Sequence, residues 1–392
     1  MNFKKISVSI TTLYLALAYL GFAFSNIVLI VAFIFYLWAL FTKRIKVDMT
    51  KENLILFFII IIPFFLTFIS TINTKVFPIN FNFVIDRLPI LLVAFIYLNT
   101  LNKKEFLLSG ISLFIIASIV AVVYTTYHLY YLNSFSLIKI DTDLSEKAAP
   151  IQRIYLGYYL LLAIVFWIHL FKKRVKKQVY YFVIIILMYG VYLSASRMAY
   201  ILLLLVMMLS VMYSYSVRKR IVISGLFIIS FLVLIYYNDN VRDRFIKSLN
   251  PETSARMMIW NNAYKVYRYS DYPVFGISIS DYYQKKTRGY WLKGNIEKAG
   301  NTYKGFYGYE PHNQYLDFIL FNGILGVFFI IGIFYLGYVI INSKNLLAIM
   351  LYIIPVSVML VESVFMRQWG VILYTVPLTI AMSLSRKDLI KK

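Results

Sequence analysis

Residues 179–216 read VYYFVIIILMYGVYLSASRMAYILLLLVMMLSVMYSYS. The stretch is apolar throughout except for a short group near its middle, Ser194-Ala195-Ser196-Arg197. Each half is about as long as the roughly 17–25 residues that a helix needs to cross the hydrocarbon core of a bilayer. The stretch therefore predicts a hairpin of two transmembrane helices whose tight turn carries Arg197.

The composition of the whole chain agrees with a membrane protein. Of its 392 residues, 61% are hydrophobic and 15% are charged, whereas soluble domains are about half apolar and about a quarter charged. The apolar runs are too long and continuous for barrel strands, so we expect helices, which satisfy their own backbone hydrogen bonds in lipid. The predicted fold class is an all-α polytopic membrane protein, with residues 1–392 forming a single membrane domain. The apolar runs predict about twelve transmembrane helices, near residues 7–23, 26–42, 54–72, 85–100, 106–131, 154–171, 179–195, 198–216, 221–238, 324–341, 346–362 and 370–384.

Short basic linkers follow every second predicted span and set the orientation. By the positive-inside rule these linkers are cytoplasmic, as are both termini. The turn at Ser194–Arg197 and the long segment 239–323 then lie on the outer, periplasmic side. The net charge of +23 could suggest nucleic acid, but about half of the Lys and Arg residues lie in short linkers between spans, where they set the topology. We therefore expect the lipid bilayer as a partner and no nucleic acid.

The long segment 239–323 is the predicted periplasmic loop subdomain, between the ninth and tenth spans. Residues 253–267 predict an amphipathic helix suited to a membrane surface. Its apolar face is expected to hold Met257, Trp260, Tyr264 and Tyr267. A second helix is predicted over residues 312–322, ending at Gly323.

Arg197, Arg256 and His312 are predicted on the same side of the membrane and are the main candidates for chemistry. Guanidinium groups are permanently charged and donate paired hydrogen bonds, which suits a pyrophosphate oxyanion. His312 is a candidate general base, with Glu310 or Asp317 to orient it. The competing interpretations are a snorkelling turn residue for Arg197, a solvated helix charge for Arg256 and a structural role for His312.

Other charged residues are weaker candidates. Arg153, at the outer mouth of the sixth span, and Arg268, at the end of the predicted surface helix, are possible members of an anion site. For Arg268 the simpler interpretation is a solvated charge. Glu362 and Arg367 flank the outer end of the eleventh span, and the simplest interpretation is that they pair with each other.

Several motifs resemble those of the O-antigen ligase and polymerase superfamily, the WaaL and Wzy proteins. They fall within roughly residues 179–341, and the twelve-span outline extends the resemblance to the whole chain. The motifs, in order, are Ser194-Ala195-Ser196-Arg197, then Arg256 with Trp260 and Ala263, then Pro273 with Gly276, then His312-Asn313-Gln314-Tyr315-Leu316 with Gly323 and Gly326.

This resemblance implies a membrane glycosyltransferase of the GT-C type in the bacterial inner membrane. Such an enzyme moves a glycan from an undecaprenyl-pyrophosphate carrier to a lipid or glycan acceptor on the outer face, without metal or another cofactor. Carried over to this sequence, Arg197 and Arg256 would hold the pyrophosphate and His312 would activate the acceptor hydroxyl. The expected substrate-binding positions are Arg153, Arg268, Glu310, Asn313 and Tyr315.

One position departs from the family pattern, and three functions stay open. The family often has Gly-x-Gly after the proline, whereas this chain has Gly276-Ile277-Ser278. A ligase that joins a finished polymer to an acceptor is favoured slightly over a polymerase that extends it on the carrier. A transporter or flippase of lipid-linked oligosaccharide is the third hypothesis. An outward-facing cluster of the candidate residues favours glycan transfer, whereas their dispersal along a central pore favours transport.

Overall fold

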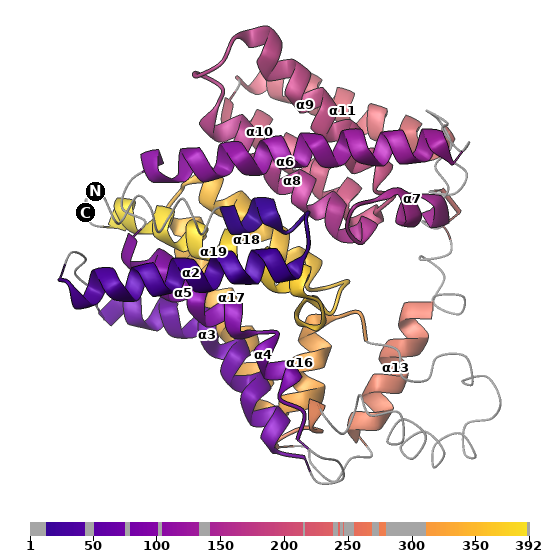
Figure 1. Cartoon of the computed structure of the whole chain (residues 1–392). Helices are drawn as coiled ribbons and strands as arrows, with labels where there is room; N and C mark the ends of the chain where they lie inside the picture. The colour runs from indigo at the N-terminus through magenta and orange to yellow at the C-terminus, as the bar shows by residue number, and fades with distance from the viewer. Residues whose placement is uncertain are drawn as a thin grey trace.

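The computed structural model describes residues 13–43, 51–74, 79–100, 104–132, 142–214, 216–237, 242–243, 246, 255–268, 274–279 and 311–389. Within these residues the chain folds into helices joined by turns and contains no strand, as the sequence predicts (Figure 1). Six helices in the described part are long and apolar enough to cross a membrane: Phe24–Phe41, Leu54–Ile72, Gly110–Tyr131, Arg153–Leu170, Ile324–Asn342 and Gln368–Ser385. Shorter apolar helices accompany them, so the protein is a polytopic membrane protein, while the total of twelve spans stays a prediction.

The helices follow the predicted spans closely from the second one on. The predicted span 85–100 is divided at Asp86-Arg87 into a short and a longer helix. The span predicted to end at 362 stops at Val358 and is followed by an irregular turn. The elements are α2 Phe22–Phe41, α3 Lys51–Ile72, α4 Asn82–Ile85, α5 Leu88–Thr100, α6 Lys104–Tyr131, α7 Thr142–Ala148, α8 Arg153–Leu170, α9 Lys177–Leu193, α10 Arg197–Ser214, α11 Val217–Tyr237, α13 Ala255–Arg268, α16 Gln314–Asn322, α17 Ile324–Asn342, α18 Leu346–Val358, the 3-10 helix η2 Val364–Met366, and α19 Gln368–Leu389.

The helices α8, α18 and α19 form the centre of the bundle. In α8 every residue from Tyr155 to Trp167 is buried, which is the pattern of a helix surrounded by protein on all sides. α19 packs against α18, α5 and α3. By contrast α2, α6 and α17 expose many large apolar side chains, as expected of helices that face lipid. The buried central helices therefore provide a rigid frame for the turns at their ends.

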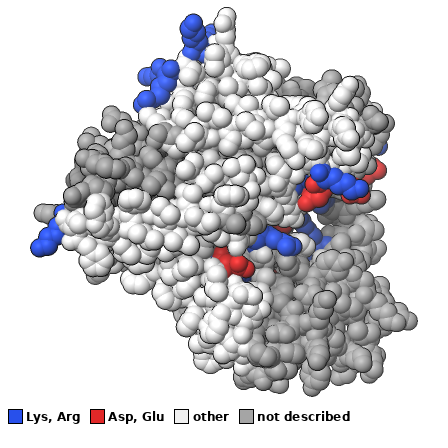
Figure 2. Space-filling view, viewed as in Figure 1, with Lys and Arg blue, Asp and Glu red and all other residues white. Residues whose placement is uncertain are grey.

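The helices α7 and α13 lie at one side of this frame. In Figure 1, α7 and α13 both lie on the right-hand side of the bundle, with α16 between α13 and the central helices. In the same view, red and blue atoms of the described residues lie together at the centre and right, whereas only blue atoms mark the upper and left edges (Figure 2). Acidic and basic side chains thus meet on the side that holds α7 and α13.

Candidate functional site

The turn between α9 and α10 is tight, as the sequence predicts. Ala195 adopts a φ of 47°, which allows the chain to reverse within three residues. The Ser194 hydroxyl donates to the Val191 carbonyl at 2.6 Å and accepts from the Ser196 amide at 3.4 Å. The Ser196 hydroxyl accepts from the Ala199 amide at 3.4 Å, so it caps the first turn of α10. Arg197, half-buried, is therefore presented at the first residue of α10.

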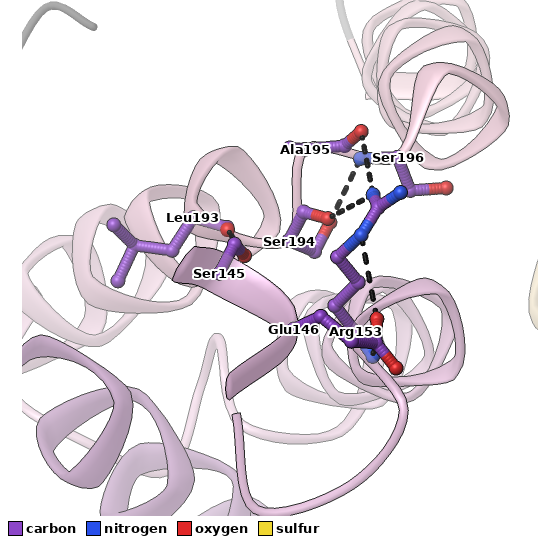
Figure 3. Close-up of polar contacts among 7 residues, drawn as sticks. All are labelled: Ser145, Glu146, Arg153, Leu193, Ser194, Ala195 and Ser196. Carbon is purple, nitrogen blue, oxygen red and sulfur yellow. Dashed lines mark hydrogen bonds and ion pairs between the residues drawn. The ribbon is translucent and has the colours of Figure 1, made fainter. Parts of the chain in front are cut away.

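Arg153 holds this turn in place (Figure 3). Its Nη1 donates to the carbonyls of Ser194 at 3.2 Å and Ala195 at 3.1 Å. Its Nε lies 3.4 Å from Glu146 Oε2 in α7, and the buried Ser145 hydroxyl donates to the Leu193 carbonyl at 2.6 Å. These contacts connect α7, the start of α8 and the turn. They give Arg153 a structural role, and its predicted contact with substrate stays a prediction.

Hydrogen bonds hold the residues on both sides of His312 in place. The Trp260 indole of α13 donates to the Pro311 carbonyl at 2.8 Å. The Asn313 side chain accepts from the amides of Tyr315 at 3.0 Å and Leu316 at 3.1 Å, so it caps α16. His312 itself has a φ of 50°, a left-handed conformation uncommon for residues with a side chain. The backbone is thus held in an unusual conformation at the candidate base.

Glu362 brings two of the three predicted catalytic residues together. Its Oε1 lies 3.4 Å from Arg256 Nη2, and its Oε2 lies 3.6 Å from His312 Nδ1. The Glu362 side chain is only 9% exposed, whereas Arg256 and His312 keep about a third of their side-chain surface exposed, 35% and 34%. The carboxylate therefore lies beneath a guanidinium and an imidazole that remain accessible.

Tyr158 connects this cluster to the turn that carries Arg197. The buried Tyr158 side chain, in α8, hydrogen-bonds the Ser196 hydroxyl and lies within electrostatic range of Glu362, Arg256 and Arg153. Arg197 directly follows Ser196 in the chain. The turn therefore contacts Tyr158, and the Glu362 cluster lies within electrostatic range of the same side chain.

Of the remaining predicted substrate-binding residues, Tyr315 and Asn313 make hydrogen bonds within the fold, and the side chains of Arg268 and Glu310 are not described. The Tyr315 hydroxyl donates to the Val356 carbonyl at 3.0 Å, and burial raises the pKa of Tyr315 well above its usual value. Tyr315 is therefore a protonated donor to the backbone, and Asn313 is the cap described above. Arg268 is the last residue of α13, and its side chain is not among the described ones. Glu310 lies outside the described residues.

The predicted apolar face of α13 is partly wrong. The buried residues of this helix include Ile259 and Ala263, while Met257 and Tyr264 are 38% and 60% exposed. The reason is that Ala263 packs with Leu320 and other apolar side chains at the end of α16. The helix is thus rotated relative to the prediction, with Arg256 turned toward Glu362.

The departure Gly276-Ile277-Ser278 has a local explanation. Gly276 has a φ of 71°, and a Cβ there would lie 2.5 Å from the backbone at the end of α16. The Ser278 hydroxyl donates to the Ser70 carbonyl at 2.7 Å, and the Ser70 hydroxyl accepts from the Ile279 amide at 3.0 Å. The serine therefore fastens this segment to the end of α3.

Glu362 is the residue that the sequence interpretation missed. It was expected to pair with Arg367, whereas the ion pairs seen for its carboxylate are with Arg256 and His312. The sequence did contain a signal that Glu362 has a specific partner. The chain has only 17 acidic residues against 40 basic ones, and Glu362 closely follows an apolar span. An ionisable residue at such a position usually has a specific partner.

Comparison with known families supports the motif pattern. A family model described as O-antigen ligase matches residues 181–331. The matched region runs from α9 into α17 and contains Arg197, Arg256 and His312, whereas Arg153 and Glu362 lie outside it. No curated protein matches the chain. The resemblance to the O-antigen ligase and polymerase superfamily is thereby confirmed by a family match over residues 181–331 of this membrane protein.

Proposed function

We propose that the protein is a membrane glycosyltransferase that moves a glycan from an undecaprenyl-pyrophosphate carrier to an acceptor hydroxyl on the outer side of the inner membrane. The observation that carries this proposal is the placement of Arg256 and His312 on the two oxygens of Glu362. Transfer from a diphosphate donor needs a cation at the leaving group and a base at the acceptor. This cluster supplies both groups side by side.

Arg256 and Arg197 are assigned to the diphosphate of the donor. A guanidinium has five N–H donors, and the contact with Glu362 engages Nη2 alone among the contacts described above. Because Arg256 is 35% exposed, its other donors can reach a phosphate oxygen while Glu362 holds one edge. Arg197 directly follows Ser196 at the start of α10 and is assigned as the second cation, which stabilises the departing diphosphate.

His312 is assigned to the acceptor. In the proposed step the acceptor oxygen bonds to the anomeric carbon of the glycan, and the bond from that carbon to the phosphate oxygen breaks. The acceptor proton moves to His312 Nε2, since Nδ1 faces Glu362. The diphosphate leaves with the bonding electron pair and remains on its carrier lipid. Attack from the face opposite the leaving group inverts the anomeric centre.

Glu362 is assigned as a positioning residue that acts through Arg256 and His312. At 3.6 Å from Nδ1 it lies just beyond hydrogen-bonding distance of the imidazole but close enough to stabilise the protonated ring. Its burial removes competing water, which strengthens both interactions. A single carboxylate thereby aligns the cation and the base relative to each other.

The arrangement favours transfer over transport. The Glu362 cluster is formed by the start of α13 and by the segments that precede α16 and follow α18, all of which are helix ends rather than mid-helix positions. A pore would require charged groups at the depth of the membrane centre. In Figure 2 the described residues show only basic side chains at the upper and left edges, whereas acidic and basic side chains lie together at the centre and right. Because basic segments favour the cytoplasmic side, this distribution supports an orientation with the Glu362 cluster on the outer side.

Deletion in the native host, followed by glycolipid analysis, tests the proposal. Loss of polymer from the acceptor with polymer accumulating on the carrier indicates a ligase, which we favour. Accumulation of single repeat units on the carrier indicates a polymerase. Unchanged glycolipids on both carrier and acceptor would contradict the proposal.

A further inference from the structure

The first residue of α16, Gln314, joins this helix to the connection between α18 and α19. It is buried, with 3% of its surface exposed. Its backbone amide donates to the Met359 carbonyl at 2.8 Å, and its side-chain Oε1 accepts from the Phe365 amide at 2.7 Å. The first N–H groups and the last carbonyls of a helix have no partner within it. The contact with Met359, at the end of α18, therefore satisfies one group of each kind.

The two hydrogen bonds of Gln314 fall on either side of Glu362. Met359 lies three residues before Glu362, and Phe365 lies three residues after it. Phe365 is also packed against α16, since its ring meets that of Phe318 edge-on at a centroid distance of 5.4 Å. A single buried residue thus holds both ends of the segment that carries Glu362.

His312 lies two residues before Gln314, so the start of α16 also fixes the position of the imidazole. Glu362 Oε2 lies 3.6 Å from His312 Nδ1. We propose that Gln314 is a positioning residue that sets this distance, an inference that rests on the proposed role of His312 as the base. Without an acceptor for the Phe365 amide, the segment loses one of the two hydrogen bonds that join it to Gln314. Electrostatic attraction weakens with distance, so a displaced Glu362 stabilises the protonated ring less.

NMR titration of the histidine rings in the full-length protein tests this role without requiring glycan transfer. The chain has three histidines, so the His312 signal is identified by its loss in His312→Ala. Gln314→Met keeps the length of the side chain but removes the acceptor. We expect the titration of the His312 ring to move to lower pH, in the same direction as in Glu362→Gln. The combined variant should titrate like Glu362→Gln alone, because the carboxylate that Gln314 positions is then absent.

Glycan transfer provides a second measurement. Gln314→Met should lower the maximal rate about tenfold, the kinetic equivalent of roughly one hydrogen bond, and should move the acid limb of the pH–rate profile to lower pH.

Asn345→Leu is the matched control, because this partly buried carboxamide joins the other end of α18 to α19. The Asn345 Oδ1 accepts from the Ala348 amide at 3.3 Å, and its Nδ2 donates to the Leu384 carbonyl at 3.4 Å. The control should leave the His312 titration and the acid limb where they are in the parent.

Other outcomes would overturn the positioning role. They are an unchanged His312 titration in Gln314→Met, an equal shift in Asn345→Leu, or a shift that adds to that of Glu362→Gln. If Gln314→Met fails to fold, Gln314→Asn, which retains the carboxamide but is one methylene shorter, provides the same comparison. The proposed function fails separately, if His312→Ala transfers glycan like the parent.

Discussion

The guanidinium of Arg256 lies 3.4 Å from the carboxylate of Glu362, although 106 positions separate the two residues in the chain. The contact joins α13 to the turn between α18 and α19. Because Arg256 is accessible and Glu362 is buried, the carboxylate orients the cation without covering it. The helix α13 thereby contributes an accessible cation to a cluster whose buried carboxylate follows α18.

Arg256→Lys should reduce glycan transfer by about a hundredfold. Lysine keeps the charge, but one ammonium cannot bind Glu362 and a diphosphate oxygen with two separate edges. Transfer in membranes from the native host, with protein levels matched by immunoblot, is the measurement. Met257→Ala, at the exposed neighbouring residue, is the control. Parental transfer by the lysine variant would show that charge alone suffices.

Glu362→Gln should change the pH dependence of transfer as well as its rate. The carboxylate stabilises the protonated form of the neighbouring imidazole, so its removal favours the neutral base at lower pH. We therefore expect the acid limb of the pH–rate profile to move to lower pH, with a lower maximum rate. A residue that served only the fold would lower the rate equally at every pH, and that result would contradict the positioning role.

Arg153→Met should destabilise the protein by about 1.5–3 kcal/mol, because two buried backbone carbonyls at the α9–α10 turn lose a charged donor. Thermal unfolding of the solubilised protein measures this effect, and Lys147→Met, at an exposed position of α7, is the control. If Arg153→Met unfolds like the parent but binds pyrophosphate more weakly, Arg153 is a substrate ligand, as the sequence suggests, and the structural role is wrong.

Ser278→Gly creates the family's Gly-x-Gly pattern and removes the hydrogen bond to the Ser70 carbonyl. We expect a loss of stability of about 1 kcal/mol, with further loss from the added backbone freedom of glycine. Transfer should remain close to parental, since Ser278 contacts α3 rather than the Glu362 cluster. A variant at least as stable as the parent would refute the fastening role of this serine.

Local patterns in the sequence predicted much of the fold. The apolar runs placed the helices because span length follows from bilayer thickness, and the polar turn before Arg197 marked the hairpin. The helix predicted over residues 312–322 ends before Gly323, as predicted, because Gly323 has a φ of 55°. Arg256 and His312 were singled out by their residue type and by their position on one predicted side of the membrane, and the resemblance to a known family then pointed to the same residues.

Features that depend on tertiary packing could not be predicted in this way. The contact of Ala263 with Leu320 decides which face of α13 is buried. The sequence of α13 alone cannot reveal this contact, because Leu320 belongs to α16. The role of Glu362 likewise requires knowing that the end of α18 lies beside His312. Arg153 looked like a free cation at a span mouth, because its carbonyl partners lie 41 and 42 residues further along the chain.

Glycolipid analysis of a deletion strain complemented with single variants tests the central claim most directly. The variants are Arg197→Ala, Arg256→Ala and His312→Ala, with Met257→Ala as the control, each confirmed to be present in the membrane. We predict that the first three lose glycan transfer by at least about a hundredfold, with carrier-linked glycan accumulating, while the control transfers normally. Parental transfer by Arg256→Ala and His312→Ala would contradict the account.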